Sequence, residues 1–183
     1  DASLRGIQPD SVKGLVLDLR YNGGGYLNGA EDIASMLLAQ GDVVSVVRRD
    51  EPVDVQKVSG NTVLPTLPLV VLINEGSASA SEILAGALQD NGRATIIGMK
   101  SFGKGTVQEV IDLPGGSSLR VTIAKWHTPK GRDLSKEGVA PDVTVQQEEN
   151  ASVDAYRQLE AALQFLTEGK VSVPTGSGAN AGN

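Results

Sequence analysis

PLVVLINEGSASASEILAGALQDNGRATIIG, residues 68–98, reads as a strand, a helix and a second strand joined by short turns. Residues 68–74 are almost wholly apolar and have strand length, which is typical of a strand buried on both faces. Residues 77–92 carry apolar side chains at helical spacing and end in an Asn-Gly pair, a common helix stop. Residues 94–98 form another buried strand. A helix between two buried strands predicts a parallel pair, so the chain belongs to the α/β class.

The same alternation extends to both sides of this segment. Residues 12–20 form an apolar run, followed by a glycine cluster and an amphipathic pattern that stops at Gly41. Residues 106–113 and 118–126 flank a Pro-Gly-Gly turn and predict a hairpin, and residues 153–166 predict a final helix. Further strand-like segments are 43–47 and 53–58. We therefore expect one mixed, largely parallel sheet with flanking helices, and a flexible C-terminal tail.

The composition argues against several classes of function. The chain has 183 residues, enough for one domain, and its 16 basic and 22 acidic residues give a net charge of −6. This charge argues against binding to nucleic acid or to an anionic membrane. The absence of cysteine excludes disulfides, zinc–thiolate sites and a thiol nucleophile, and a single histidine, His127, excludes a multi-histidine metal site. We expect no metal and no cofactor.

Two glycine-rich stretches resemble nucleotide-binding motifs, but each lacks a residue that its motif requires. GMKSFGKGT, residues 98–106, resembles a phosphate-binding loop, but Gly105 replaces the metal-binding Ser or Thr. A β-branched, alternating pattern follows, which predicts a strand where that loop requires a helix. NGGGYLNG, residues 22–29, has Asn28 where a dinucleotide fingerprint has its third glycine. These glycines serve either a positive-φ turn or the close approach of backbone amides to a ligand.

A serine nucleophile is the third hypothesis. Ser77, Ser79 and Ser81 lie where a buried strand turns into a helix, so each has its hydroxyl near unpaired amides and the positive end of the helix dipole. The alternative is that all three only cap the helix and pack. A serine nucleophile needs a base, which is either His127 or a lysine.

Lys104 is the lysine with the most suitable setting, because glycines flank it on both sides. The pKa of a lysine base must fall from about 10.4 to roughly 7 or 8, and burial has this effect. If the chain is extended here, Lys104, Thr106 and Gln108 share a face, so Gln108 is placed to orient the amine. We therefore expect Lys104 to be buried within reach of a serine; the alternative is a solvated turn lysine.

At this point the motifs resemble a known family. GLVLDLRYNGGG, NEGSASASEILAGALQDNGRA, GMKSFGKGTVQEV and KEGVAPDV are similar to successive blocks of the C-terminal (tail-specific) processing proteases, the serine–lysine peptidases of family S41. The resemblance covers roughly residues 12–145. It implies that Ser79 is the nucleophile, Lys104 the general base and Gln108 the residue that positions it.

The resemblance implies further features. The family's oxyanion hole maps onto the amides of Gly25 and Ala80, and Asp90 and Arg93 match a segment that supports the site. The implied fold is related to the crotonase and ClpP architecture. The implied organisation is a protease core at residues 1–147, truncated at its N-terminus and without the family's PDZ domain, followed by a helix and tail at 148–183.

We therefore predict a serine endopeptidase that acts on protein or peptide substrates through an acyl-enzyme, on C-terminal regions or misfolded proteins. It needs neither nucleotide nor nucleic acid, and the family suggests an extracytoplasmic location, in the periplasm or cell envelope. KWHTPKGRDLS, residues 125–135, departs from the family pattern, so cleavage specificity does not transfer. The alternatives are a non-catalytic peptide- or ligand-binding protein on the same fold and a nucleotide-dependent enzyme. The oligomeric state stays open.

Overall fold

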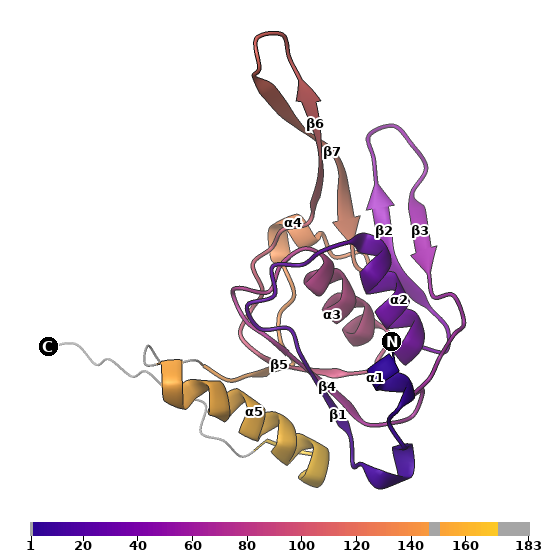
Figure 1. Ribbon diagram of the computed structural model, residues 1–183, viewed down its shortest axis with the longest axis vertical. Helices are drawn as coiled ribbons and strands as arrows, with labels where there is room; N and C mark the ends of the chain where they lie inside the picture. The colour runs from indigo at the N-terminus through magenta and orange to yellow at the C-terminus, as the bar shows by residue number, and fades with distance from the viewer. Residues whose placement is uncertain (1, 147–150, 172–183) are drawn as a thin grey trace, which may run out of the picture.

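A parallel four-stranded sheet forms the centre of the fold. The computed structural model describes residues 2–146 and 151–171. The strand order is β1 (Leu15–Asp18), β4 (Leu69–Ile73), β5 (Thr95–Gly98) and β8 (Val143–Thr144), and each neighbouring pair runs parallel (Figure 1). Every residue of β4 is buried, because layers of side chains cover both faces of this strand. The strands predicted at 68–74 and 94–98 are confirmed.

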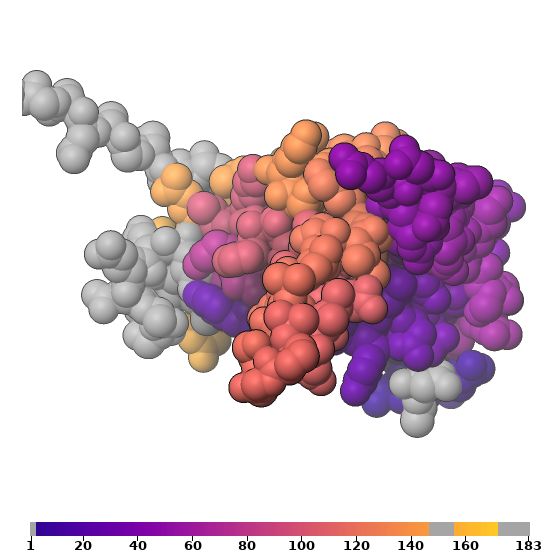
Figure 2. Space-filling view, turned by 90° about the horizontal axis from the view of Figure 1, so that it is seen from above, coloured from indigo at the N-terminus to yellow at the C-terminus, as the bar shows by residue number. Residues whose placement is uncertain are grey.

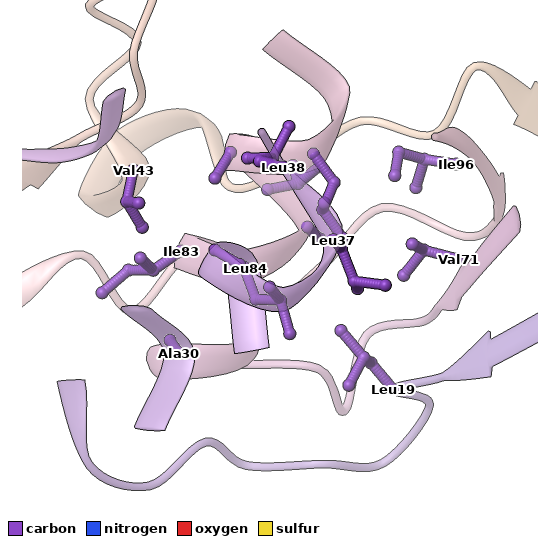
Figure 3. Packing of buried hydrophobic residues seen from close by; sticks show 14 of the residues in the cluster. Leu19, Ala30, Leu37, Leu38, Val43, Val71, Ile83, Leu84 and Ile96 are labelled. Carbon is purple, nitrogen blue, oxygen red and sulfur yellow. The ribbon is translucent and has the colours of Figure 1, made fainter. Parts of the chain in front are cut away.

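Helices α2 (Leu27–Leu37) and α3 (Ala80–Asp90) cover one face of this sheet. They lie in the crossover connections that a parallel sheet requires. Residues 80–88 of α3 are all buried, because this helix is enclosed by the sheet, by α2 and by β2. Figure 3 shows Leu37 and Leu84 of the two helices turned toward Val71 and Ile96 of the sheet. The helix predicted at 77–92 is confirmed, and its core packing holds the turn before it in place.

The longest described helix, α5 (Ala151–Glu168), covers the opposite face of the parallel sheet (Figure 1). Its buried residues Ala161 and Ala162 pack against apolar residues of β4 and β5. The helix predicted at 153–166 is therefore confirmed. Residues 147–150 and 172–183, which contain the expected domain boundary and tail, lie outside the described residues. Within the described ranges, no helix has the length and apolar character needed to cross a membrane.

A second sheet is antiparallel and has the order β3 (Asp54–Lys57), β2 (Asp42–Val47), β7 (Ser118–His127) and β6 (Thr106–Asp112). The hairpin β6–β7 projects from the body, and a view from above shows it on the near side with the β2–β3 hairpin (Figures 1 and 2). The predicted mixture of parallel and antiparallel strands is therefore divided between two sheets. The hairpin strands pair with each other and with β2, so they never join the parallel strands. The α/β class is confirmed.

Three short elements complete the described fold. They are α1 (Ala2–Arg5), a 3-10 turn at Pro9–Ser11, and α4 (Leu134–Glu137), which packs against β7 near the base of the hairpin.

Candidate active site

The turn between β4 and α3 places Ser79 at the N-capping position of α3. Its backbone has φ 59° and ψ −121°, a region that residues with a side chain rarely adopt. Holding a non-glycine residue there costs roughly 1–3 kcal/mol, and such strain concentrates at functional sites. The nucleophile of α/β-hydrolases occupies a comparable strained turn between a strand and a helix. The fold thus presents Ser79 at the positive end of a buried helix.

The neighbouring serines have different surroundings. Ser77 is fully buried, and its Oγ donates to the carbonyl of Leu19 at 2.7 Å and accepts from the amide of Asn74 at 3.0 Å. Ser81 is buried within the first turn of α3. The hydroxyl of Ser77 is therefore engaged in holding the ends of two strands together. The choice of Ser79 as the nucleophile still rests on the resemblance and stays a prediction.

Glu82 is a buried carboxylate that the sequence reasoning missed, and it is only 1% exposed. Its Oε2 accepts from the backbone amides of Ser79 and Lys104, both at 2.8 Å. Its Oε1 accepts from Ser101 Oγ at 2.5 Å and from the amide of Gly103 at 2.6 Å. One carboxylate therefore joins the turn of the candidate nucleophile to the loop of the candidate base. The Ser-x-x-Glu spacing of a capping box is the sequence signal that could have pointed to it.

The side chain of Lys104 does not lie where we expected it. It is exposed, as is that of Gln108. Among the described residues, no hydrogen bond joins Lys104 Nζ to Ser79 Oγ or to Gln108. The expectation of a buried lysine in contact with Ser79 is wrong for this structure: the amide of Lys104 is anchored to Glu82, whereas its side chain is exposed. The catalytic roles of Lys104 and Gln108 stay predictions.

The glycines beside Lys104 have structural reasons. A Cβ on Gly105 would lie 2.2 Å from the amide nitrogen of Ser135 in α4, so no side chain fits at this position. Gly103 has φ +91°, which also favours glycine. Strand β6 follows at Thr106, as predicted. The phosphate-loop hypothesis therefore lacks the helix that it requires.

The glycine cluster after β1 lies directly against the nucleophile turn. A Cβ on Gly24 would lie 2.7 Å from Ser79 Cβ and 2.9 Å from the nitrogen of Ala80. The amide of Gly24 donates to Asn22 Oδ1 at 3.0 Å, whereas within the described residues the amides of Gly25 and Ala80 donate to no backbone or side-chain acceptor. Unpaired amides beside a serine are what an oxyanion site needs. Their assignment to that role stays a prediction.

A cavity of about 190 Å³ opens beside these two amides. It is lined by Leu19, Asn22, Gly24, Gly25, Tyr26, Gly29, Ala30, Ile33, Ala80, Ser81 and Leu84. Its largely apolar wall suits an apolar side chain of modest size. A larger hollow of about 600 Å³ lies beside α5, but its charged residues Arg93 and Asp142 are already bonded to backbone groups. The smaller cavity is therefore the one connected with the candidate chemistry.

Comparison with known proteins decides the family. The family model for peptidase family S41 matches residues 1–145. This chain belongs to peptidase family S41. A chloroplastic C-terminal processing peptidase of Tetradesmus obliquus is 46% identical over 142 residues, which cover 78% of the chain and 31% of that protein. A carboxyl-terminal-processing protease of Picosynechococcus sp. is 44% identical over 170 residues, which cover 91% of the chain and 41% of that protein.

A solved structure supports the same assignment. The photosystem II D1 C-terminal processing protease superposes with a TM-score of 0.70 and 41% identity, over 80% of this chain and 40% of the solved chain. The S41 chain described here thus spans less than half the length of these relatives. The family resemblance drawn from the motifs is confirmed.

Asp90 and Arg93 of this S41 chain lie at the other end of α3, roughly 16 Å along the helix axis from Ser79. Asp90 accepts from Arg132 Nη2 at 2.5 Å and from the amide of Lys130 at 2.9 Å. Arg93 donates to the carbonyls of Leu37, Leu64 and Leu67. The structure therefore does not bring Asp90 and Arg93 to the candidate site. They hold the surrounding loops in place.

Asp133 stabilises α4, the short helix against which Gly103 and Gly105, the neighbours of Lys104, are packed. It caps α4 through the amide of Ser135 at 2.9 Å and pairs with Lys125 Nζ at 3.0 Å. Burial alone would raise the pKa of Asp133, but hydrogen bonds from Ser135 and Lys125 outweigh it and lower the pKa to about 2. His127 lies on the same strand as Lys125, and no carboxylate in the described part of the chain is hydrogen-bonded to its ring. The triad alternative therefore lacks its orienting group.

Proposed function

We propose that this chain carries the catalytic site of a serine endopeptidase, with Ser79 as nucleophile and Lys104 as general base. The observation that supports it most is the four-bonded carboxylate of Glu82, which accepts from the amides of both residues. A turn with a purely structural role would not need a buried carboxylate that joins it to a second loop. Here Glu82 joins the strained turn of Ser79 to the loop of Lys104. The unpaired amides of Gly25 and Ala80 complete the set that acyl transfer needs.

In the proposed mechanism, Lys104 in its neutral form takes the proton from Ser79 Oγ as the oxygen attacks the peptide carbonyl. The amides of Gly25 and Ala80 stabilise the oxyanion. Collapse breaks the C–N bond, and Lys104 returns the proton to the leaving amine. Lys104 next deprotonates water, which attacks the acyl-enzyme and releases the acid together with Ser79.

This mechanism requires the Lys104 side chain to turn from solvent toward Ser79. Rotation about the bonds of its four-carbon stem allows that movement, because only the amide of Lys104 is tied to Glu82. Gln108, two residues into β6, is the group that holds the amine once it has turned.

The proposed substrates are proteins or peptides, in particular the C-terminal regions of proteins. The names of the relatives, which are C-terminal processing proteases, support this substrate class. An extracytoplasmic location is proposed on the same basis of family. We also propose that residues 1–147 form the protease core, with the helix and tail of 148–183 attached to it; the family match over residues 1–145 supports this division.

The test is cleavage of a loosely folded protein such as casein. Ser79→Ala and Lys104→Ala should each abolish cleavage while circular dichroism stays unchanged. Lys100→Ala, a substitution of another exposed lysine in the same segment, is the matched control and should cleave normally. Undiminished cleavage by either active-site variant contradicts the proposal.

The exposure of Lys104 favours one alternative, a peptide-binding protein without catalysis. A fluorophosphonate probe separates the two functions, because it labels only an activated serine. Labelling that disappears in Ser79→Ala supports the peptidase. Peptide binding by a protein that never labels supports the binding role.

A further inference from the structure

Three of the chain's few aromatic side chains are exposed on the loops that build the candidate site. The chain has only two Phe, three Tyr and one Trp. Tyr21 is 63% exposed, Tyr26 is 86% exposed and Phe102 is 69% exposed. With Tyr156 on α5, four of the six aromatic side chains are exposed. Aromatic side chains contribute most when they are buried, so leaving them in solvent sacrifices core stability. Exposed apolar groups that gather in one place mark binding surfaces.

Tyr21 and Phe102 border the nucleophile turn directly. The amide of Tyr21 donates to Asn74 Oδ1 at 2.9 Å, and a Cβ on Gly76 would lie 2.8 Å from Tyr21 Cδ1. The amide of Phe102 donates to the carbonyl of Ser77 at 2.9 Å. Both rings are therefore carried by backbone that is hydrogen-bonded to the segment leading into the candidate nucleophile.

The backbone of Tyr21 is itself unusual. Its φ is +56°, a conformation in which a bulky residue is a genuine outlier. Glycine, Asn or Asp would adopt it at lower cost. The ring of Tyr21 packs along Gly76 and is still 63% exposed, so the strained backbone presents an open aromatic surface beside the nucleophile turn.

Tyr26 lies at the end of the loop that also carries Tyr21, between β1 and α2. It follows the candidate oxyanion residue Gly25 and lines the apolar cavity of about 190 Å³, together with Ile33 and Leu84. The three aromatic residues thus lie on segments that contact the turn of Ser79, next to the place where a peptide carbonyl must bind to reach it.

We propose that Tyr21, Tyr26 and Phe102 form an aromatic rim that binds apolar side chains of an extended polypeptide next to the bond to be cut. The inference rests on the proposed peptidase function and names the substrate class for that site. Aromatic rings supply large, rigid contact area at low entropic cost, which suits a surface that must grip many different apolar segments. A charged segment gains no such contact and loses hydration, so the rim selects against it.

The experiment compares two internally quenched peptides that differ only beside the cleavage site, one with Leu and Val there and one with Asp. Tyr26→Ala, Phe102→Ala and Tyr21→Asn should each lower kcat/KM for the apolar peptide about 3- to 10-fold, mainly through KM, with little change for the acidic peptide. Tyr26→Phe and Phe102→Leu should largely restore it. Tyr21→Asn should unfold at the same temperature or a higher one, because Asn tolerates positive φ.

Tyr156→Ala is the matched control. Tyr156 is also 63% exposed, but it lies on α5, on the opposite face of the parallel sheet. This variant should stay within about twofold of the parent for both peptides. An equal loss in Tyr156→Ala, or an unchanged apolar-to-acidic ratio in all three rim variants, overturns the inference.

A binding measurement keeps the inference testable if catalysis fails. Fluorescence anisotropy of the apolar peptide on Ser79→Ala protein should weaken severalfold when a rim substitution is added. If the parent neither labels with fluorophosphonate nor cleaves, the proposed peptidase function is wrong. The anisotropy measurement alone then shows whether the aromatic rim binds apolar peptide. If the parent labels and cleaves but the rim variants bind apolar peptide normally, the proposed role of the rim is wrong, whereas the proposed peptidase function is supported.

Discussion

At the scale of the residue, the backbone of Ser79, the candidate nucleophile, is strained. Its φ and ψ of 59° and −121° suit glycine and penalise any residue with a Cβ. Tyr21, with φ +56°, shows the same conflict one loop away. Two strained residues at one site indicate that the surrounding core holds the conformation against its local cost.

Ser79→Gly should therefore raise the free energy of unfolding by roughly 1 kcal/mol while it abolishes cleavage. Ser79→Ala keeps the Cβ and is the matched control, because it removes the hydroxyl without relieving the strain. Urea unfolding of the two inactive variants measures the difference. Equal stability of Ser79→Gly and Ser79→Ala would show that no strain is stored there.

At the scale of the element, the first turn of α3 and the loop before β6 act as one unit because Glu82 joins them. Both of its oxygens are filled by donors from Ser79, Ser101, Gly103 and Lys104. Hydrogen bonds to a charged group each contribute about 1.5–3 kcal/mol, and leaving buried donors unpaired is costly. The geometry of the candidate dyad therefore depends on a residue that need not touch the substrate.

Glu82→Gln should lower the free energy of unfolding by roughly 2–4 kcal/mol, because an NH2 group that can only donate replaces an oxygen that accepts from two donors. Among correctly folded molecules, kcat/KM should fall at least about tenfold, since Ser79 and Lys104 lose their shared anchor. Urea unfolding and casein cleavage measure the two effects. Glu75→Gln, an exposed change in the same turn, should alter neither; a Glu82→Gln protein with parental stability contradicts this account.

At the scale of the whole molecule, acid stability depends on Asp133, whose contacts cap α4 and tie it to Lys125 of β7. Its pKa in the folded protein is about 2, below the ordinary 3.8. A lowered pKa stabilises the fold at pH values above about 4, and this stabilisation disappears as the pH falls through 2. The shift corresponds to roughly 2 kcal/mol.

Asp133→Asn should therefore be about 2 kcal/mol less stable than the parent at pH 6, and the two proteins should converge near pH 2. Urea unfolding at a series of pH values from 6 to 2 gives the difference directly, because other titrating groups are common to both proteins. A difference that stays constant with pH would show that the carboxylate charge is not responsible.

The sequence by itself determined the α/β class, the helices and strands of residues 68–98, the hairpin and the family. These features depend on local patterns: apolar runs of strand length, helical spacing and ordered motifs around Ser79 and Lys104. The Ser-x-x-Glu spacing is typical of a capping box and could have pointed to Glu82, but it indicates only the contact with Ser79 and none of those with the loop before β6.

Only the tertiary structure decided which distant groups meet. Pairing between β2 and β7 separated the strands into two sheets, and hydrogen bonds across more than 20 residues joined Glu82 to Lys104. Packing also left the Lys104 side chain in solvent and placed Asp90 and Arg93 at the far end of α3. The physical reason is the same in each case: burial and long-range hydrogen bonding depend on how elements stack, and neither is encoded in local spacing.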